Sequence, residues 1–164
     1  MDSNVFPLSG LRLQAVRRKL FLSTVEAASF FPNCTAAGWE AMESGQTEVP
    51  SHVSQRLDRI LEWRNAQMAI IEAGMSLQLD QDGILDFWHE SMDDWMAIDG
   101  REPENYRAMQ SLQADWALNH PSRVTLVRFD RVDFTRWLVG RTPTEERQAE
   151  YLYTFAAPLA DRPY

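Results

Sequence analysis

The 164-residue sequence has only one cysteine, Cys34, which excludes an intrachain disulfide framework and favours a reducing compartment. It also has no long apolar run. Arg12, Arg17, Arg18 and Lys19 interrupt the N-terminal segment, and no stretch approaches the roughly 18 apolar residues of a membrane span. We therefore expect a cytoplasmic protein with no membrane partner.

Residue patterns typical of enzymes and metal sites are scarce as well. The three histidines, His52, His89 and His120, stand far apart, and none has a metal-ligand spacing with cysteine or another histidine. No glycine-rich phosphate loop is present, and the acidic stretch at Asp93-Asp94 is more typical of a solvated face than of a cation site. We expect no catalytic residue, no metal and no cofactor, and predict that the protein is not an enzyme.

Positive charge is in short supply, and its distribution divides the chain. The formal net charge is −8, with 16 basic and 24 acidic residues. Residues 1–64 carry seven of each, so the whole acidic excess belongs to residues 65–164. Proteins that coat nucleic acid by bulk attraction need many Lys and Arg side chains to neutralise phosphates. Any contact with nucleic acid must therefore be local in this protein.

Two short helices are predicted at the start of the chain. Apolar positions indicate a first helix over residues 9–20, with Ser9 as its N-cap. The run Ser23-Thr24-Val25-Glu26 then has the form of a capping box, in which hydroxyl and carboxylate satisfy each other's free backbone N–H groups. The helix that begins there must end before Pro32, because a ring without an N–H cannot continue the hydrogen-bond ladder.

A third short helix and a long fourth helix follow. Thr35 is placed to cap a helix over residues 36–42, and Gly45 suits the left-handed position that closes it. Pro50 fits the first turn of the fourth helix, whose apolar residues repeat at helical spacing as far as Met75. These segments predict a helical domain in the first half of the chain.

Taken in order, these segments resemble the lambda-repressor-like helix-turn-helix superfamily. The motifs cover about residues 10–61 and are Leu13-x-x-Val16-Arg17, Leu22-Ser23-x-x-Glu26-Ala27-Ala28, Trp39-Glu40-x-Met42-Glu43-Ser44-Gly45 and Val49-Pro50. The resemblance implies a buried ion pair between Arg17 and Glu43 that ties the first helix to the third. Partly buried charges must be paired in any case, because leaving one without its partner costs about 3–5 kcal/mol.

The resemblance also implies which residues face DNA. In this fold the second helix sets its N-terminus on a phosphate, and the third helix lies in the major groove. The expected DNA-binding residues are Arg12, Ser23, Thr24, Thr35, Ala36, Ala37, Ala41, Ser44, Gln46 and Thr47. The alanines depart from the family, because methyl groups lack the donors and acceptors that discriminate bases. Specificity would then depend on DNA shape or on Arg12, Thr35, Gln46 and Thr47.

The second half of the chain predicts two short strands among helices. Residues 84–88 and 124–129 are rich in aromatic and β-branched side chains and are predicted to be strands. Two isolated strands cannot stabilise themselves, so they should pair with each other or with a second subunit, and a dimer would meet this need. The expected helices cover residues 91–98, 102–118 and 132–139. The run Thr142-Pro143-Thr144-Glu145-Glu146 is typical of a further capped helix start, and Tyr151, Tyr153 and Phe155 suggest that this tail packs.

A narrower resemblance comes from this second half. Leu85-x-Phe87, a helix, and then Tyr106-Arg107-x-x-Gln110-Ser111-Leu112-x-Ala114 are similar to the anti-CRISPR-associated repressor and YdiL-like family. Members of that family join a helix-turn-helix head to a small dimerising domain. This sequence departs from the family at Tyr106, where tryptophan is usual, and residues from about 122 onward exceed the usual length.

The sequence therefore predicts a mainly α protein with a small α+β C-terminal part. Residues 1–64 form the helix-turn-helix head, and residues 65–164 form a dimerisation or interaction domain that follows a long helix. The expected function is a homodimeric transcriptional repressor that binds a palindromic double-stranded DNA operator, and a phage-defence or mobile-element setting would favour autoregulation. Two alternatives stay open: a protein-interaction module on an inherited helix-turn-helix scaffold with weak or no specific DNA binding, and an RNA-binding regulator.

Overall fold

The computed structural model of the protein describes residues 8–77 and 84–156. The chain forms two compact units, Met1–Gln67 and Met68–Tyr164, and their boundary falls within one long helix, α4 (Ser51–Leu77). The described residues are mainly helical with one two-stranded sheet, as the sequence predicts. Residues 1–7 of the first expected domain, and 78–83 and 157–164 of the second, lie outside the described residues. Within the described ranges, none of the helices is both long and apolar enough to span a bilayer.

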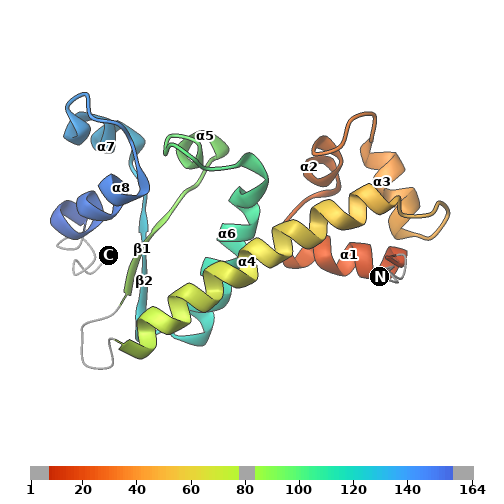
Figure 1. Ribbon diagram of the computed structural model, residues 1–164, viewed down its shortest axis with the longest axis horizontal. Coiled ribbons are helices and arrows are strands. Elements are labelled where there is room, and N and C mark those ends of the chain that lie inside the picture. Colours follow the sequence, from red (N-terminus) through yellow and green to blue (C-terminus); the bar gives the residue numbers. More distant parts are fainter. Residues whose placement is uncertain (1–7, 78–83, 157–164) are drawn as a thin grey trace, which may run out of the picture. The chain divides into compact units, whose positions relative to one another are not determined.

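The first unit contains three short helices before α4. They are α1 (Gly10–Lys19), α2 (Thr24–Ser29) and α3 (Ala36–Glu43), and the turn between α2 and α3 spans residues 30–35 (Figure 1). Each helix begins at an N-cap whose side-chain oxygen accepts a backbone N–H: Ser9, Ser23 and Thr35. The capping box of Ser23 and Glu26 is complete in both directions. Local sequence signals therefore set where these helices start.

The helices of the first unit enclose an apolar core. Its largest fully buried side chains include Leu13 of α1, Trp39 of α3 and Leu57 of α4. Gly10 is required at the start of α1, because a Cβ there would lie 2.4 Å from the carbonyl oxygen of Met42. The backbones of α1 and α3 approach each other so closely only because this position has no side chain.

The second unit is built on two parallel strands. Strand β1 (Ile84–Trp88) pairs with β2 (Val124–Arg128), with Ile84 opposite Val124 and Trp88 opposite Arg128. The strands therefore pair with each other, which is one of the two options that the sequence left open. A parallel pair needs a long crossover, and helix α6 (Tyr106–Asn119) supplies most of it.

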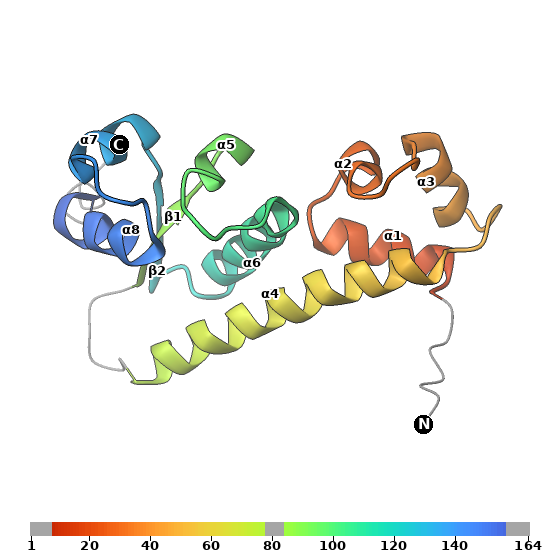
Figure 2. The same cartoon turned by 45° about the horizontal axis from the view of Figure 1, so that its top comes forward.

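Helices cover both faces of this small sheet. On one face Val124 and Leu126 pack with Trp116 and Ala117 of α6 and with Ile71 of α4. On the other face lie α7 (Arg131–Leu138) and α8 (Glu145–Tyr151), and Figures 1 and 2 show them across the strands from α6. The buried core on that face consists of Phe87, Ile98, Phe129, Phe134, Leu138, Tyr151 and Leu152. The strand side chains alternate between these two layers.

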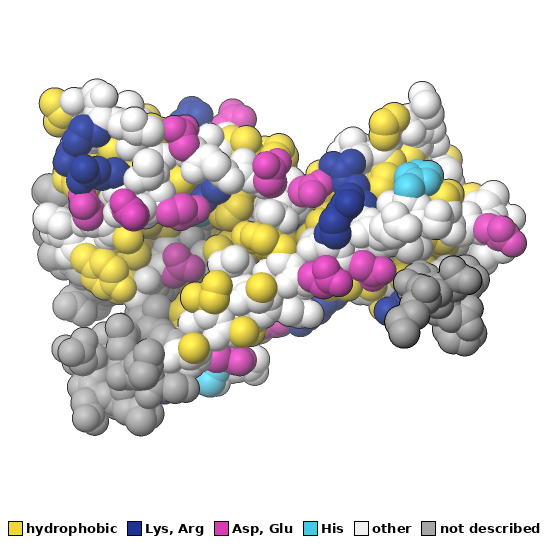
Figure 3. Space-filling view, in the orientation of Figure 1, with side chains coloured by type: hydrophobic (Ala, Val, Ile, Leu, Met, Phe, Trp, Pro, Cys, Tyr) yellow, Lys and Arg dark blue, Asp and Glu magenta, His cyan; other side chains and the backbone are white. Residues whose placement is uncertain are grey.

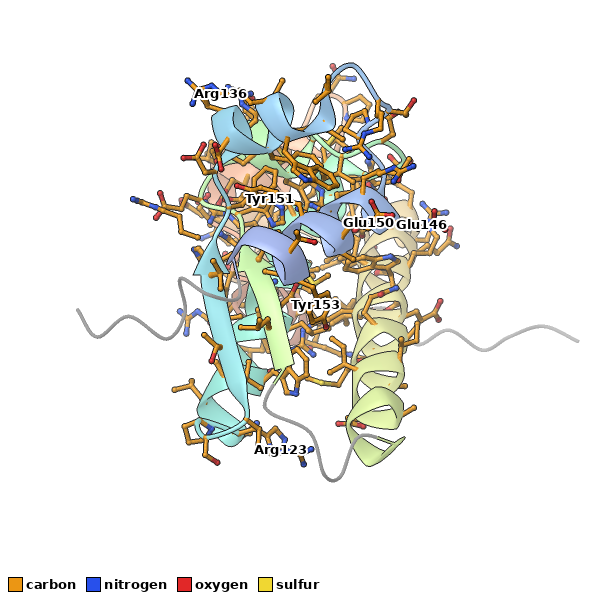
Figure 4. The ribbon with its side chains drawn as sticks, turned by 90° about the vertical axis from the view of Figure 1, so that its left-hand side faces the viewer. Arg123, Arg136, Glu146, Glu150, Tyr151 and Tyr153 are labelled. Atoms are coloured by element: carbon orange, nitrogen blue, oxygen red, sulfur yellow. The ribbon has the colours of Figure 1, made fainter. Side chains whose placement is uncertain are left out.

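Three further short elements complete the unit: α5 (Met92–Trp95), the 3-10 helix η1 (Pro103–Asn105) and the π-helix η2 (Leu152–Ala156). The expected helix over 91–98 is thus shorter than predicted. The C-terminal segment packs only in part: Tyr151 is buried, whereas Tyr153 is 64% exposed. The expectation that Tyr153 packs is therefore wrong. Figure 4 shows Tyr151 between α7 and α8, with Tyr153 on the other side of α8. The side chain of Phe155 lies outside the described residues.

Polar side chains of α6 and α8 hold the outer edge of β1. Gln113 donates to the carbonyl oxygen of Phe87 at 2.9 Å, and Gln110 donates to that of His89 at 2.9 Å. Arg101 and Gln148 both donate to Nε2 of His89, at 2.9 and 2.8 Å, so this imidazole is neutral with its proton on Nδ1. Burial and the nearby Arg101 charge lower the pKa of His89 to about 3. Side chains thus supply at β1 the partners that a third strand would supply.

The surface of the second unit carries both signs of charge. On the face shown in Figure 3, Arg side chains gather over α7 and Asp and Glu side chains over α8. Arg101 links α8 to the loop before α6, because its guanidinium donates to both carboxylate oxygens of Glu145 and stacks 4.0 Å from the ring of Trp95. This contact ties the C-terminal helices to the rest of the unit.

Candidate nucleic-acid interface

The structure brings Arg17 and Glu43 together at the contact between α1 and α3. Arg17 donates from Nε to Glu43 Oε1 at 2.5 Å and from Nη2 to Oε2 at 3.0 Å. The same carboxylate accepts Nε1–H of Trp39 at 2.7 Å and the amide of Gln14 at 3.3 Å. The two charged side chains are only 12% and 5% exposed. Glu43 therefore accepts hydrogen bonds from four donors, and the three that come from α1 fix α3 against it.

The electrostatics of this pair follow from its geometry. Burial by itself raises the pKa of Glu43, but hydrogen bonds from Arg17, Trp39 and Gln14 outweigh burial and the pKa lies below its ordinary value. The hydrogen bond to Glu43 raises the pKa of Arg17. Both groups are thus charged at neutral pH, as a paired and hydrogen-bonded buried ion pair requires.

Arg56 of α4 holds the turn between α2 and α3 from the other side. Its Nη1 donates to the carbonyl oxygen of Phe30 at 2.5 Å, at the C-cap of α2. Its guanidinium also lies over the rings of Phe30 and Phe31, 5.9 and 5.4 Å from their centroids. A cation at this end satisfies a terminal carbonyl and complements the helix dipole. Sequence reasoning missed Arg56, because its partner is a backbone carbonyl 26 residues away.

The two residues expected to contact phosphate at the start of α2 are engaged within the protein. The hydroxyl of Ser23 donates to Oε2 of Glu26 at 2.7 Å and accepts the N–H of Glu26 at 3.1 Å. The hydroxyl of Thr24 donates to Oε1 of Glu40 at 3.4 Å. Neither hydroxyl proton is free to reach a phosphate without giving up a contact.

The outward face of α3 consists mostly of small side chains. Helical geometry places Ala37, Ala41 and Ser44 on the side opposite the buried Trp39, whereas Ala36 lies about 60° from Trp39 round the axis. Ala37 and Ser44 are exposed, and Ala36 and Ala41 are half-buried. The hydroxyl of Ser44 donates to the carbonyl oxygen of Ala41 at 3.1 Å. The structure thus brings the expected base-facing residues together, and their chemistry is apolar.

The remaining expected residues lie at the two ends of α3 or away from it. Thr35 is exposed at the N-cap, where its oxygen accepts the N–H of Gly38 at 3.1 Å and its own proton stays available. Gln46 and Thr47 are exposed in the loop after α3. Arg12 precedes Arg17 by five residues, which puts it about 140° round α1 from the side that contacts α3. The structure therefore does not bring Arg12 to this face.

One charged side chain on the outward face of α3 was not in the predicted set. Glu40 is exposed, and round the helix axis it lies between Ala36 on one side and Ser44, Ala37 and Ala41 on the other. The sequence signal was available, since Glu40 stands four residues after Ala36 and four before Ser44. Sequence reasoning treated it only as part of the family motif.

A hollow of about 350 Å³ opens beside the start of α3, lined by residues that include Cys34, Thr35 and His52. Cys34 is a free, half-buried thiol that contacts the carbonyl oxygen of Thr35 at 3.7 Å. The lining offers no set of charged donors for a cofactor. Across residues 8–77 and 84–156, no three His, Cys, Asp or Glu side chains gather in a way that would hold a metal ion.

Comparison with known proteins gives one family match. A family model described as Aca2/YdiL-like matches residues 8–117, which confirms the resemblance drawn from the sequence. The match runs from α1 into α6 and leaves β2, α7 and α8 outside. Five of the seven buried residues in the core around Phe87 come from that unmatched part. A search of curated proteins found no match.

Proposed function

The chain belongs to the Aca2/YdiL-like family, a family of regulators of the helix-turn-helix type, and we propose that it is a DNA-binding transcriptional repressor that acts as a homodimer. In this proposal α2 and α3 form the helix-turn-helix, and α3 lies in the major groove. The protein acts by binding an operator and carries out no catalysis. Autoregulation is the proposed role if its gene lies in a phage-defence or mobile-element setting.

One observation carries the proposal: α3 presents an exposed face while its opposite side is fixed from behind. Glu43 receives four hydrogen bonds there, and Arg56 holds the turn that precedes α3. A helix that reads base edges must be held in a defined orientation, because hydrogen bonds to bases tolerate little displacement.

The second unit is the proposed dimerisation domain, acting through residues after 65. Two heads related by two-fold symmetry would place two α3 helices in successive major grooves, about 34–36 Å apart along one face of DNA. The operator would then be palindromic. The charge distribution agrees with this division of roles. Residues 65–164 hold the whole acidic excess, and DNA phosphates would repel them.

The test is salt-dependent binding to DNA from the protein's own upstream region, measured by fluorescence anisotropy between about 50 and 200 mM salt. The informative variant is Thr35→Asp, because aspartate keeps an N-cap acceptor and adds a negative charge beside the proposed groove. Its matched control is Thr144→Asp, the same substitution at the N-cap of α8. We expect Thr35→Asp to lose at least tenfold in affinity and Thr144→Asp to bind like the wild type.

Equal binding by both variants would contradict placement of α3 in the groove. The interaction-module alternative is favoured by the three alanines on α3. It predicts that a protein partner binds with unchanged affinity after Ser23, Thr24 and Thr35 are all changed to Glu. The RNA alternative predicts that a transcript of the same region competes with the duplex at equal or lower concentration, and that Thr35→Asp weakens both.

A further inference from the structure

The outward face of α3 has a single ionisable group, Glu40, which lies at the edge of that face next to α2. With 100° between successive residues, Glu40 lies about 40° from Ala36 and about 40° from Ser44 round the helix axis. Ala37, Ala41 and Ser44 contribute methyl groups and a hydroxyl already donated to the backbone. Among the side chains of α3 on this face, only Glu40 therefore has a polar group left for a base-specific hydrogen bond.

The carboxylate is held at one oxygen and open at the other. Thr24, the first residue of α2, donates to Oε1 at 3.4 Å, a long hydrogen bond. Oε2 has no hydrogen-bond partner in the part of the chain that the structure describes. The negative charge is partly compensated from behind, since Glu40 is one of the groups that raise the pKa of Arg17. The start of α2 and the middle of α3 thus orient an acceptor on the outward face.

A carboxylate discriminates between base edges because it only accepts hydrogen bonds. In the major groove cytosine presents the N4 amino donor, whereas guanine presents the N7 and O6 acceptors and thymine presents the O4 acceptor. Adenine has an amino donor, but its N7 acceptor lies beside it and would repel a second carboxylate oxygen. Of the four bases, cytosine therefore fits Glu40 best.

We infer that Glu40 is the specificity-determining residue of α3 and selects a cytosine through its N4 amino group at one position of each operator half-site. The inference rests on the proposed DNA-binding function. It also explains how α3 can discriminate bases although Ala36, Ala37 and Ala41 have no polar groups. The small side chains surround the carboxylate without competing for the base.

The experiment is selection from a DNA library randomised over the half-site, carried out with the full-length wild type, Glu40→Gln and Glu40→Ala. The control is Glu62→Gln, which removes one negative charge from an exposed position of α4. Affinities for the selected duplex and its three single-base variants at each position are then measured by anisotropy. Thermal unfolding checks that all variants are folded, which the exposure of Glu40 leads us to expect.

The wild type should prefer cytosine at one position per half-site by about 5- to 150-fold, the range of one good base contact. Glu40→Gln should change the preference at that position to adenine, which glutamine contacts at N6 and N7. Glu40→Ala should lose discrimination there and keep it elsewhere. The inference is overturned if Glu40→Gln and Glu40→Ala keep the base preferences of the wild type and show only the uniform gain in affinity seen for Glu62→Gln. The proposed function would still stand. No binding of any duplex by the wild type would overturn both.

Discussion

Replacing Glu43 by alanine should destabilise the first unit far more than the loss of an ordinary surface charge. The substitution removes the acceptor for two guanidinium N–H groups of Arg17, the indole N–H of Trp39 and the amide of Gln14. Arg17 is left charged at 12% exposure, and Trp39, which is 0% exposed, is left with an unsatisfied donor. Nothing else in the change compensates for these losses.

The magnitude can be worked from these contacts. Removal of one partner from a buried ion pair costs about 3–5 kcal/mol. An unsatisfied buried N–H adds about 1–3 kcal/mol, part of which is already included in the first figure. We therefore expect the free energy of unfolding to fall by about 4 kcal/mol. That is a large share of the roughly 5–15 kcal/mol that holds a typical domain together.

The effect also has a definite pH dependence. The folded-state pKa of Glu43 lies below its ordinary value of 4.5, so its stabilising contribution is complete above that value. It is lost as the pH falls through the lowered folded-state pKa. The difference in stability between wild type and Glu43→Ala should therefore be constant at neutral pH and shrink under acid conditions.

The assay is urea denaturation combined with hydrogen exchange of peptides from α1 and α3, which assigns the loss to the first unit. The control is Glu150→Ala, which breaks the exposed pair of Arg147 and Glu150 and should cost at most about 1 kcal/mol. Equal losses in the two variants would refute the reasoning. The double variant Arg17→Leu with Glu43→Leu should recover part of the stability, but not all, because Trp39 still lacks an acceptor.

Three further outcomes are expected. Arg56→Met should lower the free energy of unfolding by about 1.5–3 kcal/mol, because the hydrogen bond to Phe30 is lost, and Arg56→Lys should restore part of it. Urea denaturation measures both variants, and an unchanged stability of Arg56→Met would show that Arg56 does not support the turn. Phe134→Ala, at 1% exposure in the second core, should cost about 3–5 kcal/mol by the same assay, and a loss below 1 kcal/mol would contradict its place there. His89 stays neutral when folded, so its contribution to stability is present above pH 6.5 and is lost at about 1.4 kcal/mol per pH unit down to its pKa of about 3. Burial raises the pKa of Asp86, so the contribution of Asp86 to stability changes with pH in the opposite direction. The effect of His89 is therefore measured as the difference in free energy of unfolding between wild type and His89→Gln, compared at pH 7 and pH 5.

The helices and caps of the first unit were predictable because their causes are local. Ser23 and Glu26 lie three residues apart, and Thr35 caps the helix that follows it directly. Such contacts form between near neighbours whatever the rest of the chain does. The pairing of Arg17 with Glu43 is long-range, and it came from the family resemblance, supported by the cost of burying a lone charge.

The sequence predicted which residues make up the candidate site, but not which of their polar groups are free to bind. The family resemblance implied that Ala36, Ala37 and Ala41 stand at the base-facing positions of the third helix. It could not show that the hydroxyls of Ser23 and Thr24 are occupied by Glu26 and Glu40. Side-chain hydrogen bonds depend on rotamers and on the distance between α2 and α3, and the spacing of residues along the sequence determines neither.

The sequence by itself determined that this protein is a member of the Aca2/YdiL-like family with one cysteine and an acidic second half, because composition and local motifs decide those features. Only the tertiary structure decided that β1 and β2 pair in parallel, and that Gln110 and Gln113 take the place of a further strand. It also decided that Arg56 supports the turn before α3. These contacts join residues more than twenty positions apart, and their partners are backbone groups that every residue carries, so no residue pattern marks them in advance.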